Sequence, residues 1–487
     1  MSRSAGVFVV LLVVLAGCQA PTATQASVAH PQPGSMATEN APAPETDRLG
    51  WENGYWHNAT LSITPDDGLN ESERAAVVAR AMARVEVVRG LEFERDVSID
   101  VTTRAAYANQ TSGDGTANAT QRTFENVRAE ALFLVGEQRD SVAVRQESMG
   151  QSVLGYYSPS SESIVLVSDS ETPRITNERT LAHELTHALQ DQHFGIGGHV
   201  ANTSDARKGR LGLVEGDAML VEDRYIDRCG ETWDCVQSKT EGTSVGGASS
   251  RMHMGLYLAA IFPYVDGSVF VTHLHDRGGW DAVNAAYERA PSTTAEVISP
   301  ERYPTDADAV QLRDESTDDW ERVRPAAGDG DRLGQALLST MFMYTLYDEF
   351  NRSAAVDVRT ALNVDDDGTM DQTDPLNYAL PATAGWTGDR FHAYRNGDRT
   401  GYVLQTTWRN ASEAGEFAEA YRGLLSHWGG ERVGPNRWRV GPDSPFTDAY
   451  AVIVDGETVT VVNAPTTDAL GEVYGPAGPT AQRVEAR

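Results

Sequence analysis

Hydrophobic residues along the chain follow two periods, and these predict both helices and strands. Apolar positions three or four residues apart run through residues 71–90, 176–193 and 411–428, and they predict amphipathic helices. Two apolar runs around a Ser/Pro turn at residues 153–170 predict a hairpin, and residues 449–464 predict further strands. We therefore expect an α+β fold.

The first residues of the chain carry an apolar pattern of a different kind. The run from Val7 to Leu15 ends in small residues and is too short to span a bilayer, which takes roughly 20 residues. It predicts a signal peptide over residues 1–17. The sequence from Leu15 to Cys18 also resembles a lipobox, after which Cys18 becomes the lipidated first residue; an ordinary secretory signal is the alternative. We expect a protein anchored by lipid to the extracellular face of the cell membrane.

Composition divides the rest of the chain into four segments. Residues 18–48 are rich in Pro, Ala and Thr, have too few apolar residues for a core, and predict a linker behind the lipid anchor. Residues 49–150 predict an N-terminal α/β region, and residues 151–312 contain a helix rich in histidine. An acidic stretch separates these from residues 326–487, which predict a C-terminal α+β domain.

The stretch LAHELTHALQDQHF, residues 181–194, predicts a helix with one chemically unusual face. Its apolar stripe leaves His183 and His187 four residues apart on the opposite side, with Glu184 beside them. Histidines at this spacing can place two imidazole nitrogens around one tetrahedral Zn²⁺, while the adjacent glutamate can reach a water on the metal. We expect two zinc ligands and a catalytic Glu184; the alternative is a structural helix with partly exposed histidines.

Two residues compete as third ligand of this predicted zinc site. His193 has the spacing of the metzincin peptidases, but these need a helix-breaking glycine where this chain has Gln190. On a continuing helix, at about 100° per residue, His193 lies roughly 80° from His183 and points away from the metal. Glu215 lies on a second predicted helix, in GLVEGDAMLVEDRY, and completes a His₂Glu site. We therefore favour Glu215.

The motif HELTHALQ followed by a helix with EGDA resembles the gluzincins of the peptidase MA clan. Residues 262–303 and 384–398 are also similar to haloarchaeal surface lipoproteins that carry the same HExxH motif. The resemblance implies a zincin-like catalytic domain, with an active-site helix and an edge-strand hairpin, in which Glu215 binds zinc. Met219 departs from the aspartate of thermolysin-like gluzincins, and Glu222 or Asp191 are candidates to replace that aspartate.

The charge of the chain limits its partners. Forty basic residues against seventy acidic ones leave a formal net charge of -30. Phosphate binding needs a basic face, so we expect no nucleic acid as partner. The acidic residues are scattered, and arginine outnumbers lysine, a composition that resembles proteins of halophilic archaea.

Two further signals concern cross-links and a second metal. Cys229 and Cys235, six residues apart, predict a disulfide that closes a small loop in an oxidising compartment. Residues 363–374 partly match an EF-hand calcium loop, although the first and last positions depart from it, and a solvated acidic loop is the alternative. The candidate Ca²⁺ ligands in that loop are Asn363, Asp365, Asp367, Asp371 and Asp374.

Two classes of function follow from these patterns. The first is a membrane-anchored zinc metallopeptidase, a hydrolase that acts on peptides or proteins outside the cell. The second is a non-catalytic cell-surface lipoprotein with a structural or vestigial metal site. Glu184 beside the two histidines favours the enzyme, because a structural zinc has no use for that carboxylate.

Overall fold

The computed structural model describes most of the chain between residues 37 and 478. The described ranges are 37–38, 43–63, 68–107, 118–149, 153, 155–168, 178–197, 201–236, 252–325, 328–351, 353–364, 368–371 and 373–478. Helices and strands are mixed along these ranges, so the protein is α+β, as its sequence predicts. The chain divides into two compact units, and neither is a single continuous segment.

The first unit comprises residues 1–111, 149–192 and 224–251. Its longest helix, α1 (Glu71–Arg89), begins at Asn70, where the side chains and backbone N–H groups of Asn70 and Glu73 form a reciprocal capping box. The helix ends at Gly90, whose φ of 72° suits a residue without a Cβ. Two short strand pairs precede α1: β1 (Ala37–Thr38) with β4 (Thr60–Leu61), and β2 (Trp51–Glu52) with β3 (Tyr55–Trp56).

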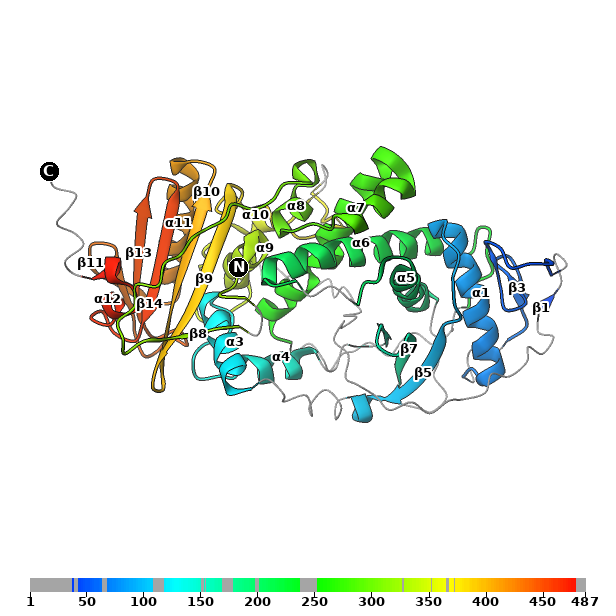
Figure 1. Ribbon diagram of the computed structural model, residues 1–487, viewed down its shortest axis with the longest axis horizontal. Helices are drawn as coiled ribbons and strands as arrows, with labels where there is room; N and C mark the ends of the chain where they lie inside the picture. Colours follow the sequence, from blue (N-terminus) through cyan, green and yellow to red (C-terminus); the bar gives the residue numbers. More distant parts are fainter. Residues whose placement is uncertain are drawn as a thin grey trace, which may run out of the picture. The chain divides into compact units, whose positions relative to one another are not determined.

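A three-stranded sheet and the histidine-rich helix complete the first unit. The sheet has the order β5 (Ser98–Thr103), β7 (Ser163–Ser168), β6 (Gly155–Ser158), and β5 and β7 run parallel (Figure 1). Strands β6 and β7 form the expected hairpin, which leaves β6 at one edge of the described sheet. Helix α5 (Arg179–Phe194) follows and belongs to this unit as far as Gln192.

The second unit comprises residues 112–148, 193–223 and 252–487, and a seven-stranded antiparallel sheet dominates its C-terminal part (Figure 1). Tyr402 and Leu404 point to the face that α11 (Ala411–His427) covers, while Val403 points to the other face, where α12 (Leu470–Val473) packs. The strands, in sheet order, are β11 (Gly430–Gly434), β12 (Arg437–Val440), β13 (Ala449–Asp455), β14 (Thr458–Ala464), β10 (Arg399–Trp408), β9 (Trp386–Asn396) and β8 (Glu321–Val323).

The remaining helices of the second unit surround a large apolar core. They are α3 (Ala119–Ala131), α4 (Ser141–Met149), α7 (Met254–Glu288), α8 (Thr294–Ile298), α9 (Gly334–Met343) and α10 (Val358–Ala361), with short 3₁₀ turns at Pro300–Arg302, Tyr344–Leu346 and Gly475–Ala477. Helix α7 is long and apolar enough to cross a membrane by length and composition, but 72% of its most apolar window is buried inside the protein. Gly278 and Gly279 interrupt its helical geometry.

Helix α6 (Ser204–Arg228) carries Glu215 and belongs to the second unit as far as Asp223. It crosses α7 within that unit at a pair of glycines. A Cβ on Gly216 would lie 2.0 Å from the carbonyl oxygen of Gly267, so only glycine fits at this crossing. The glycine beside Glu215 therefore serves helix packing.

Candidate metal centre

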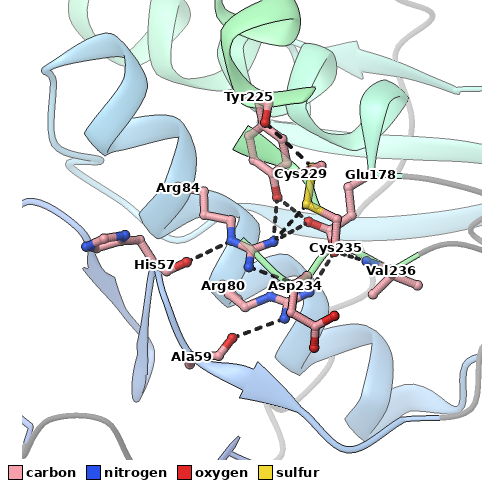
Figure 2. The surroundings of a disulfide bond; sticks show 10 residues. All are labelled: His57, Ala59, Arg80, Arg84, Glu178, Tyr225, Cys229, Asp234, Cys235 and Val236. Atoms are coloured by element: carbon pink, nitrogen blue, oxygen red, sulfur yellow. Dashed lines mark hydrogen bonds and ion pairs between the residues drawn. A yellow bond between two sulfur atoms is a disulfide. The ribbon is translucent and has the colours of Figure 1, made fainter. Parts of the chain in front are cut away.

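The start of α5 is held by a buried cluster of opposite charges (Figure 2). Glu178 accepts the N–H of Ala182 through its carbonyl oxygen, and its carboxylate forms ion pairs with Arg80 at 2.6 Å and Arg84 at 2.9 Å. The backbone N–H of Val236 donates to the same carboxylate at 2.7 Å. All three charged side chains are almost fully buried, so each depends on the others for compensation. This cluster joins the start of α5 to α1.

A disulfide closes the loop beside this cluster. Cys229 and Cys235 are bonded to each other, and the carbonyl oxygen of Asp234 within the loop accepts a hydrogen bond from Arg84 at 3.1 Å (Figure 2). Tyr225, one turn before the loop, donates its hydroxyl hydrogen to Glu178. Burial, and then the charge of Glu178, hold the pKa of Tyr225 well above its ordinary value. The hydroxyl of Tyr225 therefore stays protonated and helps to hold Glu178 at the start of α5.

His183 and His187 lie on one face of α5 and are buried. Their Nε2 atoms are 3.2 Å apart, so the same nitrogen of each ring faces the other ring. The Nδ1 atom of His187 lies 2.9 Å from the side-chain oxygen of Gln190. A proton on Nδ1 that is donated to this oxygen leaves the Nε2 lone pair of His187 available to a metal.

Glu184 is held by the edge strand of the first unit. Its Oε2 atom accepts the backbone N–H of Tyr157, on β6, at 2.8 Å, and its side chain is fully buried. This amide points away from β7, so it lies on the side of β6 where a further strand could pair. The hydroxyl of Tyr157 donates to Asp191 at 3.0 Å, which ties the same strand to the following turn of α5.

The sequence patterns do not by themselves predict these positioning contacts. In the sequence, Gln190 mattered only because a metzincin has glycine at that position. In the structure, its side chain orients His187. Tyr157 was part of the expected hairpin without a role of its own. Its pKa is raised by burial and by the charge of Asp191. The i,i+3 spacing of His187 and Gln190 on the helix is a signal that could have revealed the first contact.

His183 and His187 offer two potential ligand atoms within the first unit, and Glu215 is the predicted third ligand. Glu215 is 2% exposed and lies in the part of α6 that belongs to the second unit. Its role as third ligand stays a prediction. The ring of His193, the other candidate, lies 6.0 Å from that of Phe194.

Other predicted site residues lie outside the described residues or in a different setting. Cys18, Asp365 and Asp367 fall outside those residues, so the predicted lipidation site and part of the predicted calcium loop are not described. In the described part of that loop, the N–H of Asp371 donates to the carbonyl of Asn363 at 3.1 Å. Burial, and then the charge of Asp371, raise the pKa of Asp374 to about 6. Calcium binding by this loop remains a prediction.

One family model matches the chain, a domain of unknown function (DUF8575) over residues 321–474. This range begins at β8, ends after α12 and takes in the whole seven-stranded sheet. No curated protein and no solved structure matches the chain.

Proposed function

We propose that the protein is a zinc-dependent metallopeptidase, anchored by lipid at the extracellular face of the cell membrane, that hydrolyses peptide bonds. The 3.2 Å separation between the Nε2 atoms of His183 and His187 carries this proposal. Two nitrogens on one tetrahedral Zn²⁺, each about 2.0–2.1 Å from the metal, lie roughly 3.3 Å apart. The histidine pair therefore has the spacing of two ligands of one ion. Glu215 is the proposed third ligand.

Zinc bound there would supply an open coordination position and a Lewis acid for the scissile carbonyl. Glu184 would accept a proton from the attacking water as general base and pass it to the leaving amine. Because the N–H of Tyr157 fixes one carboxylate oxygen, the other oxygen keeps a defined direction for this transfer. Gln190 would hold His187 in the tautomer that offers Nε2 to the metal.

The position of β6 supports an extended peptide as substrate. An edge strand has backbone N–H and C=O groups that can pair with an added strand. The amide of Tyr157 is on that side and contacts Glu184, so a peptide paired with β6 would pass beside the proposed general base. This arrangement favours cleavage within an extended segment of peptide or protein.

The experiment compares variants of one helix in the full-length protein at high salt. Glu184→Gln should keep zinc and lose hydrolysis of a peptide library by about 100- to 10,000-fold, because loss of a general base typically has that effect. His187→Ala and Glu215→Ala should lose both zinc and activity, since catalytic zinc sites use three protein ligands. His193→Ala is the matched control and should keep both.

Two outcomes would contradict parts of this proposal. Zinc retained by Glu215→Ala but lost by His193→Ala would replace the gluzincin arrangement with a metzincin-like one. If the wild type binds zinc but cleaves no library peptide, and Glu184→Gln changes nothing measurable, the protein is a non-catalytic surface lipoprotein with a structural metal. Anchoring is tested separately, because Cys18→Ser should release the protein from membranes into the medium.

A further inference from the structure

A second group of potential ligands lies wholly within the second unit and far along the chain from the HExxH helix. It consists of Glu130, Glu137 and Asp448, and one carboxylate oxygen of each lies within 4.8 Å of those of the other two. Glu130 is the penultimate residue of α3, Glu137 lies in the loop before α4, and Asp448 directly precedes β13. The group thus joins the end of α3 and the loop after it to the start of β13, more than 300 residues further along the chain.

The three carboxyl groups lack a compensating positive side chain. Within the described residues, none of them forms an ion pair with Arg, Lys or His. Burial, and then the charges of Asp448 and Glu137, hold the pKa of Glu130 well above its ordinary value. Burial, and then the charge of Glu137, raise the pKa of Asp448 to about 8. As ionised groups they therefore repel one another in a poorly solvated place.

An unsatisfied acceptor atom of Glu130 at the same place points to a ligand. In the described part of the chain, no hydrogen bond reaches Oε1 of Glu130, which is 3% exposed, or Oδ1 of the fully buried Asn463. The amide of Asn463 donates to Asp448 at 2.7 Å, so this residue adjoins the three acids. A buried acceptor without a donor is costly, and Oε1 of Glu130 is an acceptor that a cation can satisfy.

We propose that Glu130, Glu137 and Asp448 bind a divalent cation, Ca²⁺, at the junction of α3 with the seven-stranded sheet. Ca²⁺ takes six to eight oxygen ligands in flexible geometry, which suits carboxylates from a helix end, the following loop and a distant strand start, completed by water. Mg²⁺ demands a near-ideal octahedron and fits such a set less well. Glu137 is exposed and gives the ion a route from solvent. The ion would link the end of α3 to the start of β13.

The test uses the full-length protein, freed of divalent ions and then given one equivalent of Zn²⁺. Ca²⁺ should raise the melting temperature of the wild type, and Tb³⁺ should give luminescence sensitised by nearby aromatic residues that Ca²⁺ then displaces. Glu137→Gln and Asp448→Asn should each weaken Ca²⁺ by about 10- to 100-fold or more, as loss of an important metal contact does. Glu431→Gln, at an exposed position on β11, is the matched control and should leave this binding unchanged.

A second comparison separates a metal ligand from a structural residue. Without Ca²⁺, Glu137→Gln should melt at or above the temperature of the wild type, because it removes repulsion; with Ca²⁺, the order should reverse. This exposed position decides the outcome even if Asp448→Asn does not fold. The proposal is overturned if Ca²⁺ changes neither the melting temperature nor the Tb³⁺ luminescence of the wild type. It is also overturned by a Ca²⁺ response that survives in Glu137→Gln but disappears in Asp371→Asn, in the EF-hand-like loop.

Discussion

Buried carboxylates occur in both units of the protein, but their surroundings differ. In the first unit, Glu178 is compensated by two arginines and by a backbone N–H. In the second, buried Glu130 and Asp448 lie beside exposed Glu137 and hydrogen-bond among themselves, and the amide of Asn463 also donates to Asp448. The first cluster contains its own counter-charges, whereas the second requires protons or an external cation.

This difference distinguishes carboxylates that stabilise the fold from carboxylates that can bind an ion. A carboxylate whose lone pairs are all filled by the protein can hold segments together, as Glu178 holds the start of α5. Carboxylates that the protein leaves uncompensated retain affinity for an ion. Glu52 and Glu86 of the first unit lie between these cases, because two backbone N–H groups donate to Glu86 while burial raises the pKa of Glu52 to about 9.

The largest effect should come from removing the carboxylate between the two arginines. Glu178→Ala leaves Arg80 and Arg84 buried without their partner, and breaking a buried pair in this way costs about 3–5 kcal/mol. We expect a much lower midpoint of unfolding in urea at high salt. Glu162→Ala, which removes the partner of exposed Arg95, is the control and should cost less than about 1 kcal/mol. If Glu178→Ala and Glu162→Ala lower the free energy of unfolding equally, the buried ion pairs do not stabilise the fold more than an exposed one.

A smaller loss should follow when the loop beside Glu178 is opened. Cys229→Ser removes the disulfide, and for so short a loop we expect a loss of about 2 kcal/mol in the free energy of unfolding. Denaturant unfolding measures this loss, and reduction of the wild type should reproduce it. If neither treatment changes stability, the ion pairs of Glu178 hold the loop without help from the disulfide.

The smallest effect should be a change in pH dependence in the first unit. Burial raises the folded-state pKa of Glu52 to about 9 and that of Glu86 to about 7, so the folded protein binds protons more tightly than the unfolded chain. The stabilisation is therefore present at low pH and declines as pH rises toward 9. We expect a gradual decline between pH 5 and pH 9, because the two carboxyl groups interact and lose their protons one after the other over this range.

Glu52→Gln should flatten this decline, since glutamine does not ionise. Unfolding at several pH values between 5 and 9 in high salt provides the measurement. Glu94→Gln, at an exposed position in the same unit, is the control and should leave the slope as it is in the wild type. If Glu52→Gln and Glu94→Gln show the same dependence of unfolding free energy on pH, groups other than Glu52 cause the decline.

Features that depend on neighbours along the chain were accessible from sequence. The expected helix at residues 176–193 corresponds to α5 (Arg179–Phe194), and the expected hairpin corresponds to β6 and β7. Cys229 and Cys235 are also close in sequence and form a disulfide. By contrast, consecutive segments do not describe the two units, because each unit gathers stretches from separate parts of the chain.

The placement of His183 and His187 on one helix face followed from sequence alone, because four residues make just over one helical turn. Only the tertiary structure decided what surrounds that face. Tyr157 meets Glu184 because a hairpin folds back beside the helix, and no local period relates the two residues. The meeting of Glu130 with Asp448 is of the same kind, since a helix end and a strand start become neighbours only when the sheet and its helices pack together.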